Sequence, residues 1–382
     1  MNSPIYLDYS AATPVSDVVM TAAQPYFQER FYNPSARYLL AKAVRDDLRH
    51  ARASIGQQLG VKADEVFFTA GGTEANNLAV HGVMQQYPGK RCVISAIEHD
   101  AIYQPAHEYD CAVASINDAG VVDVAALEGL IDDDTVLVSV MYANSEIGTI
   151  QPLRAIVGVL QQVRRDREQR GVVLPLIFHT DACQAPNHLD VQVTNLGVDM
   201  LTLNGGKIYG FKQSGCLYVN RHIKLKHIMH GGGQERGVRS GTENVAHAVG
   251  LAVALEQAVQ KRTTLTKHIS ELQQYFMREL EQLGGVINGS SKRRIANNVN
   301  AAFPGASNER LMMQLDMAGI IVATGSACHA SILSEPSRVL TALGVDEDQA
   351  RSSLRFSMGR DTTKEQLQAV VNRLREFYRG KQ

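Results

Sequence analysis

The sequence predicts an α/β fold in which helices cover both faces of a mostly parallel sheet, with a smaller α+β unit beside it. Two observations support this prediction. Short apolar runs alternate with helical patterns over residues 36–260, and such alternation is typical of parallel sheets with helical crossovers. Polar side chains also directly follow several apolar runs, at the strand ends where α/β sheets bind ligands.

The individual elements follow from hydrophobic spacing. Residues 36–59 carry apolar side chains at helical intervals, and Gly60 is expected to end that helix. Strands are expected at 66–69, 92–95, 136–141, 177–180, 200–203 and 216–219. Helices are expected between several of them, at 74–86, 123–131 and 153–170.

A second unit is expected after a long, partly interrupted helix over 243–283. Its elements are expected to be a strand at 297–303, a helix at 308–317, a strand at 320–323, a strand at 353–357 and a helix at 363–378. We therefore expect a large domain of residues 13–260 and a small domain of residues 1–12 and 261–382.

Composition excludes several classes of protein. The 382 residues carry a net charge of −1 and 45% apolar residues, which is typical of a globular enzyme and gives no basic field for direct nucleic-acid binding. No apolar run reaches the length of a membrane span, and the N-terminus lacks a signal pattern. The five cysteines include no CxxC pair, so neither a metal site nor a disulfide framework is expected. A cytoplasmic location follows by default.

Lys207 and Asp181 each follow a short apolar strand, and Lys207 lies in a glycine turn. A lysine amine with a carboxylate at a neighbouring strand end is what pyridoxal phosphate (PLP) requires. The lysine forms a Schiff base, and the aspartate keeps the pyridine nitrogen protonated so that the ring acts as an electron sink. Taken alone, Lys207 would more often be a solvated loop lysine, so the prediction depends on its neighbours.

Other polar groups are expected at the same strand ends. Gly72 and Thr73 open a helix whose N-terminal N–H groups favour a phosphate, although Thr73 alone would equally be a plain helix cap. His99 is suited to stack on a cofactor ring and to move protons, whereas a lone histidine is more often structural. Ser145 is expected at the rim of the site, and Gln184 is close enough to Asp181 to reach the phenolic oxygen of PLP.

Two later segments add anion-binding and thiol groups. The glycine-rich stretch 229–242 carries Arg239 and Thr242 and is typical of a loop that holds a phosphate or contacts a subunit. Cys328 lies among small residues without helical or strand period, so we expect an accessible thiol on a mobile loop, with an inert cysteine as the alternative. Arg355 suits a carboxylate because a guanidinium donates two parallel hydrogen bonds.

Together these stretches resemble the cysteine desulfurases, PLP-dependent enzymes of the class V aminotransferase type. The resemblance covers nearly the whole chain, in order. It is carried by Ala70-Gly-Gly-Thr-Glu-Ala-Asn-Asn77, Glu98-His99, Lys207-Ile-Tyr-Gly210, the glycine-rich stretch ending at Thr242, and Gly325-Ser-Ala-Cys328. It implies the PLP-dependent transferase fold type I, with a large domain around a mostly parallel seven-stranded sheet.

The resemblance also implies a role for each candidate. Lys207 holds PLP and moves the substrate α-proton, His99 stacks on the ring and shuttles protons, and Cys328 takes the sulfur of L-cysteine as a persulfide while alanine is released. The other implied cofactor contacts are Asp181, Gln184, Thr73, Gly72, Asn204, Ser145 and, from the neighbouring subunit of a homodimer, Thr242. Asn33 and Arg355 are implied to hold the substrate carboxylate.

Three features depart from the family pattern. The family commonly has Ser-Gly-His before the lysine, but this chain has Asn204-Gly-Gly206. We therefore expect weaker PLP retention, with Asn204 donating to the phosphate. Ser145 stands where the family has an asparagine. The chain also ends at Gln382, soon after its last expected helix, whereas housekeeping members carry a longer tail that helps to dock the iron–sulfur scaffold.

Several functional alternatives stay open. The short tail favours a dedicated sulfur route, such as DNA phosphorothioation, tRNA thiolation or a specialised iron–sulfur pathway, and the sulfur-acceptor protein is not identified. A selenocysteine lyase or another class V PLP enzyme is the next reading. A catalytically weakened adaptor is a third, motivated by Gly206 and Ser145, but the presence of Lys207, Asp181 and His99 argues against it.

Overall fold

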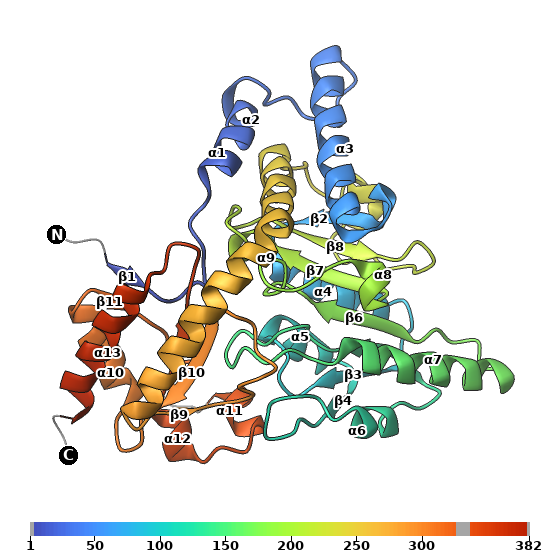
Figure 1. Ribbon diagram of the computed structural model, residues 1–382. Coiled ribbons are helices and arrows are strands. Elements are labelled where there is room, and N and C mark those ends of the chain that lie inside the picture. Colours follow the sequence, from blue (N-terminus) through green and yellow to red (C-terminus); the bar gives the residue numbers. More distant parts are fainter. Residues whose placement is uncertain (1–3, 326–336, 380–382) are drawn as a thin grey trace.

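The computed structural model describes residues 4–325 and 337–379. A seven-stranded sheet forms its centre (Figure 1). From one edge to the other, the strands are β2 (Val66–Thr69), β8 (Gly215–Val219), β7 (Met200–Asn204), β6 (Ile177–Asp181), β5 (Thr135–Ser139), β3 (Arg91–Ser95) and β4 (Asp110–Ala114). Neighbouring strands pair in parallel except at β8, which is antiparallel to β7 and β2. The predicted fold class is confirmed.

Helices cover both faces of this sheet. Alternate residues of a strand point to opposite faces, and on β3 Val93 belongs to one hydrophobic cluster while Cys92 and Ile94 belong to another. The helices that pack with Val93 are α3 (Leu39–Leu59), α7 (Leu153–Gln169) and the first part of α9 (Val245–Gln282). Those that pack on the other face are α4 (Gly72–Met84) and α5 (Asp100–Ala106).

A separate hydrophobic cluster surrounds Phe276, Phe303 and Phe356. It is built from the second part of α9, an antiparallel sheet and a parallel pair that joins residues near the N-terminus to residues about 315 positions later. Its other elements are β1 (Ile5–Tyr6), β9 (Val286–Ile287), β10 (Asn298–Ala302), α10 (Asn308–Met317), β11 (Ile320–Ile321), β12 (Ser353–Ser357) and α13 (Lys364–Arg379). Helix α9 is continuous rather than interrupted. The domain division at 12/13 and 260/261 stays a prediction.

Short helices complete the described chain. They are α1 (Asp17–Ala23), α2 (Pro25–Gln28), α6 (Val124–Gly129), α8 (Val193–Leu196), α11 (Arg338–Ala342) and α12 (Glu347–Arg351). Helices α1 to α3 form a lobe that projects from the body (Figure 1). No described helix combines the length and the apolar character that a membrane crossing needs.

Local side-chain chemistry explains where several helices begin and end. Ser337 caps α11 by accepting the N–H of Leu340, and Asp346 caps α12 by accepting the N–H of Gln349. Gly60 ends α3 with a φ of 69°, in the left-handed region that favours glycine. These residues mark where α11 and α12 begin and where α3 ends.

Candidate active site

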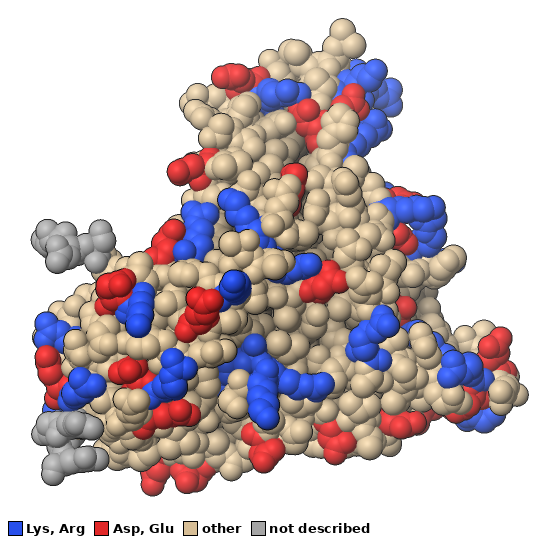
Figure 2. All heavy atoms as spheres, viewed as in Figure 1, with Lys and Arg blue, Asp and Glu red and all other residues tan. Residues whose placement is uncertain are grey.

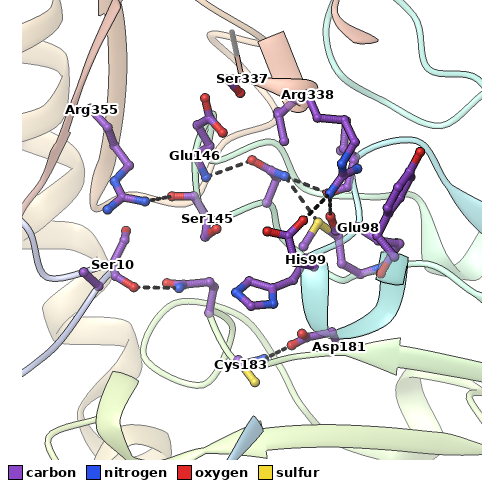
Figure 3. Close-up of a pocket in the computed structure, with 18 of the residues that line it drawn as sticks. Ser10, Glu98, His99, Ser145, Glu146, Asp181, Cys183, Ser337, Arg338 and Arg355 are labelled. Atoms are coloured by element: carbon purple, nitrogen blue, oxygen red, sulfur yellow. Dashed lines mark hydrogen bonds and ion pairs between the residues drawn. The ribbon is translucent and has the colours of Figure 1, made fainter. Parts of the chain in front are cut away.

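One cavity of about 530 Å³ opens beside the carboxyl ends of the central strands. Its size falls within the usual range for small-molecule sites. Most of the predicted site residues line it, namely Gly72, Thr73, His99, Ser145, Asp181, Gln184, Asn204, Lys207 and Arg355. The structure therefore brings together groups that are widely separated in sequence (Figure 3).

Lys207 ends a short 3₁₀ turn, Gly205–Lys207, that follows β7 directly. Its Nζ donates hydrogen bonds to the backbone carbonyls of Ser10 at 2.8 Å and Ala11 at 2.6 Å. The turn itself is held by Thr13, whose N–H donates to the carbonyl of Gly206 at 3.0 Å. The N-terminal segment thus forms one wall of the cavity and fixes where the lysine amine lies.

Asp181 is the last residue of β6 and is buried. One carboxylate oxygen accepts a 2.6 Å hydrogen bond from Nδ2 of Asn76, and the other accepts the N–H of Cys183 at 2.9 Å. These two donors hold the carboxylate in one orientation while it faces the cavity. Asn76 was missed in the sequence analysis, although its position three residues after Thr73 on a helix places both residues on the same face.

His99 is the N-cap of α5, and its Nδ1 accepts the N–H of Ala101 at 3.0 Å. The preceding residue, Glu98, is fully buried, and Oε1 accepts hydrogen bonds from Ser95 Oγ at 2.5 Å and from the Met141 N–H at 2.7 Å. Burial raises the pKa of Glu98 to about 8. The carboxyl group beside His99 is therefore mainly protonated at neutral pH.

Arg355, on β12, lies across the cavity from Asp181 (Figure 3). Its Nη2 donates to Asp8 Oδ1 at 2.7 Å and its Nη1 to the carbonyl of Ser145 at 3.3 Å. Its buried Nε has no hydrogen-bond partner among the described residues. Because Arg355 lines the cavity, its guanidinium offers a positive charge to an anionic group that enters there. Gln184 lies nearby and donates from Nε2 to the carbonyl of Ser10 at 3.0 Å.

Comparison with known proteins supplies the family. The model of class V aminotransferases matches residues 5–370. A cysteine desulfurase IscS from Dictyoglomus turgidum is 38% identical over 381 residues, which cover 97% of this chain and 94% of that protein. The chain belongs to the cysteine desulfurase family of class V aminotransferases.

Solved structures agree with this family. A NifS-like protein superposes with a TM-score of 0.90 at 29% identity, covering 98% of this chain and 99% of its own. SspA, solved in complex with cysteine, superposes with a TM-score of 0.81 at 30% identity and covers 94% of this chain and 100% of its own. The resemblance stated from the sequence is therefore confirmed, and enzymes of this family depend on PLP.

The residues of this desulfurase fit PLP at its phosphate end. Residues 70–74, at the N-terminus of α4, line a second cavity of about 490 Å³ that also includes Lys207. Free N–H groups at a helix N-terminus favour an anion. This turn requires glycine at both positions. A Cβ on Gly72 would lie 2.8 Å from Cys183 Sγ, and Gly71 has a φ of 137°.

Lys212 is a further residue at this end of the site that the sequence analysis missed. It lines the 490 Å³ cavity, and its Cα and Cγ lie 3.6 Å from where a Cβ on Gly206 would be. Lys212 therefore borders the position at which the family commonly has an imidazole. Asn204, in the same turn, accepts the N–H of Gly206 at 3.0 Å through its side-chain oxygen, which leaves its amide group as a donor.

Two predicted residues lie elsewhere, and a third is not described. Thr242 lines a separate cavity of about 210 Å³, which Ala70 also lines. Asn33 is exposed in the loop before α3, where its side-chain oxygen accepts the N–H of Ser35 at 2.9 Å. Cys328 lies outside the described residues. The roles expected of these three residues stay predictions.

Proposed function

We propose that this chain converts L-cysteine to L-alanine with bound PLP and transfers the sulfur as a persulfide on Cys328 to an acceptor protein. The observation that carries the proposal is the convergence of Lys207, Asp181 and Arg355 on one cavity. Relatives named cysteine desulfurase, and the SspA structure with cysteine, support cysteine as the substrate.

The chain supplies a binding group for each charged part of the reacting system. Asp181, held by Asn76, accepts a hydrogen bond from the protonated pyridine nitrogen, while Lys212 and the N-terminus of α4 bind the phosphate. Arg355 binds the substrate carboxylate opposite Asp181. When bound, PLP withdraws electrons from the substrate and weakens its bonds around the α-carbon.

Two side chains move protons at the reacting centre. Lys207, whose Nζ donates to the Ser10 and Ala11 carbonyls, would hold the cofactor through its amine and would move the substrate α-proton. His99 would stack on the cofactor ring and exchange protons with the substrate. Its Nδ1 accepts the Ala101 N–H, which ties the imidazole to the first turn of α5.

The sulfur transfer itself is assigned to Cys328 on the motif Gly325-Ser-Ala-Cys328. The Cys328 thiolate forms an S–S bond with the substrate sulfur, and the substrate Cβ–S bond breaks. The electron pair of that bond remains on Cβ, which takes up a proton to give alanine. The terminal sulfur of the persulfide then passes to an acceptor in iron–sulfur assembly, tRNA thiolation or DNA phosphorothioation.

We also propose that the protein is a homodimer that pairs through the projecting lobe. Large apolar side chains are exposed there, namely Val18, Met20, Phe27, Phe31, Tyr38, Leu39 and Leu40. Figure 2 shows uncharged surface between the charged groups of this lobe. Clustered apolar exposure of this kind marks an interface. In such a dimer, Thr242 would serve the cavity of the partner.

The dimer is tested by sedimentation. Leu39→Asp places a charge in the lobe and should shift the protein toward monomer. Val173→Asp, which alters an even more exposed apolar residue outside the lobe, should leave the sedimenting mass unchanged. A native protein that sediments as a monomer would overturn this part of the proposal.

The cofactor site is tested by trapping. The protein purified with PLP should absorb in the near-visible range. Borohydride reduction followed by peptide mass spectrometry should place the cofactor on Lys207, and Lys207→Ala should abolish both signals. A colourless protein, or an adduct on another lysine, would contradict the proposed site.

A further inference from the structure

The guanidinium of Arg338 forms hydrogen bonds with the segment that carries His99. Arg338 is the first residue of α11, yet its side chain reaches the loop between β3 and α5 (Figure 3). Nη1 donates to the carbonyl of Ala96 at 2.6 Å, and Nη2 donates to the carbonyl of Glu98 at 2.5 Å. Both bonds restrain the backbone immediately before His99.

The same side chain restrains the residues that follow His99. Nη2 of Arg338 lies 3.2 Å from Asp100 Oδ1. Its guanidinium carbon lies 3.9 Å from the centroid of the Tyr103 ring, one turn along α5, which is a close cation–π contact. A single guanidinium therefore contacts residues both before and after His99 in the sequence.

The base of Arg338 is itself fixed to this part of the large sheet. Val339 and Leu340, the next two residues of α11, are buried in a cluster with Ile97 and Met141. Ile97 lies between the two carbonyls that Arg338 binds. The backbone of Arg338 is therefore held by this packing, and its hydrogen bonds restrain the position of the loop before His99.

We propose that Arg338 is a positioning residue that holds the His99 imidazole in its productive place over the cofactor. The inference rests on the function proposed above, in which His99 moves protons. Its physical basis is that the planar guanidinium binds two carbonyls and one carboxylate at once. A lysine supplies one point charge in place of that fork, and methionine supplies no donor.

A double-mutant cycle tests the inference. Arg338→Met should slow single-turnover alanine formation about tenfold to a hundredfold, since small displacements of a catalytic group have effects of that size. His99→Asn removes the imidazole but keeps an oxygen that can cap α5, and should slow the reaction about a hundredfold or more. If Arg338 acts through His99, Arg338→Met should have less than about a twofold effect in the His99→Asn background.

Further variants separate positioning from general stability. Arg338→Lys should recover part of the lost rate, and Arg373→Met, which removes a surface arginine paired with Glu376, should change nothing. The visible circular dichroism of bound PLP should change in Arg338→Met but not in Arg373→Met, because the stacked imidazole shifts against the ring.

Two results would overturn the inference in distinguishable ways. If Arg338→Met slowed the reaction by the same factor with and without His99, Arg338 would act independently of the imidazole while the proposed function stood. If His99→Asn alone reacted at the native rate, the role of His99 in the proposed function would fail first, and the inference would fall with it.

Discussion

Replacing Glu98 by glutamine should make the protein more stable at alkaline pH while leaving its stability in mild acid nearly unchanged. Burial raises the pKa of this carboxyl from 4.5 to about 8. The Glu98 carboxyl therefore loses its proton at lower pH in the unfolded chain than in the folded protein. Stability from the protonated carboxyl is complete below about pH 4.5, declines as pH rises, and is lost once pH passes about 8.

The size of the effect follows from the difference between the pKa of Glu98 in the folded protein and its ordinary value. Each pH unit between the two pKa values corresponds to about 1.4 kcal/mol, so ionisation of Glu98 would cost the folded protein up to about 5 kcal/mol. Glutamine has the shape of the protonated acid and never ionises. Its side-chain oxygen can still accept the hydrogen bonds from Ser95 and Met141.

The assay is thermal unfolding of the native chain and Glu98→Gln from about pH 5 to about pH 9. The melting temperature of the variant should rise above that of the native protein progressively with pH. Glu271→Gln, at an exposed position of α9, should have the melting temperature of the native protein at every pH. A constant difference between native and Glu98→Gln across the range would refute the buried, protonated state of Glu98.

Two further predictions concern the cofactor groups. Lys212→Met should raise the PLP dissociation constant, measured by equilibrium dialysis, about tenfold, whereas Lys224→Met should leave it unchanged. Equal PLP affinities of Lys212→Met and the native chain would show that Lys212 does not bind the phosphate. Asn76→Ala should lower the melting temperature and slow alanine formation about tenfold, because Asp181 loses its 2.6 Å donor; a variant as fast as the native chain would show that Asp181 needs no such support.

The periodic elements of the large sheet could be predicted from the sequence because their apolar residues are continuous or regularly spaced. Strands β6 and β7 were predicted to within one residue at each end. The edge strand β4 was not predicted, since Asp110-Cys-Ala-Val-Ala114 contains small residues and only a weak pattern. Helix α5 was also missed, because it is short and contains Pro105.

The site could be predicted in part because parallel strands end at the same edge of a sheet, so residues that follow them meet there. Lys207 and Asp181 line the same cavity for that reason. The carbonyls of Ser10 and Ala11, which bind the lysine amine, lie almost two hundred residues earlier. No local pattern marks such long-range contacts, and Arg338 was missed for the same physical reason.

Alanine release from L-cysteine, measured with PLP and a reductant for the native chain and for Cys328→Ala, tests the proposed function most directly. We expect steady release by the native chain, a persulfide on Cys328 when the reductant is omitted, and loss of turnover in the variant. Release at the native rate by Cys328→Ala would contradict the transfer of sulfur through Cys328, and no release from either protein would contradict the proposed desulfuration itself.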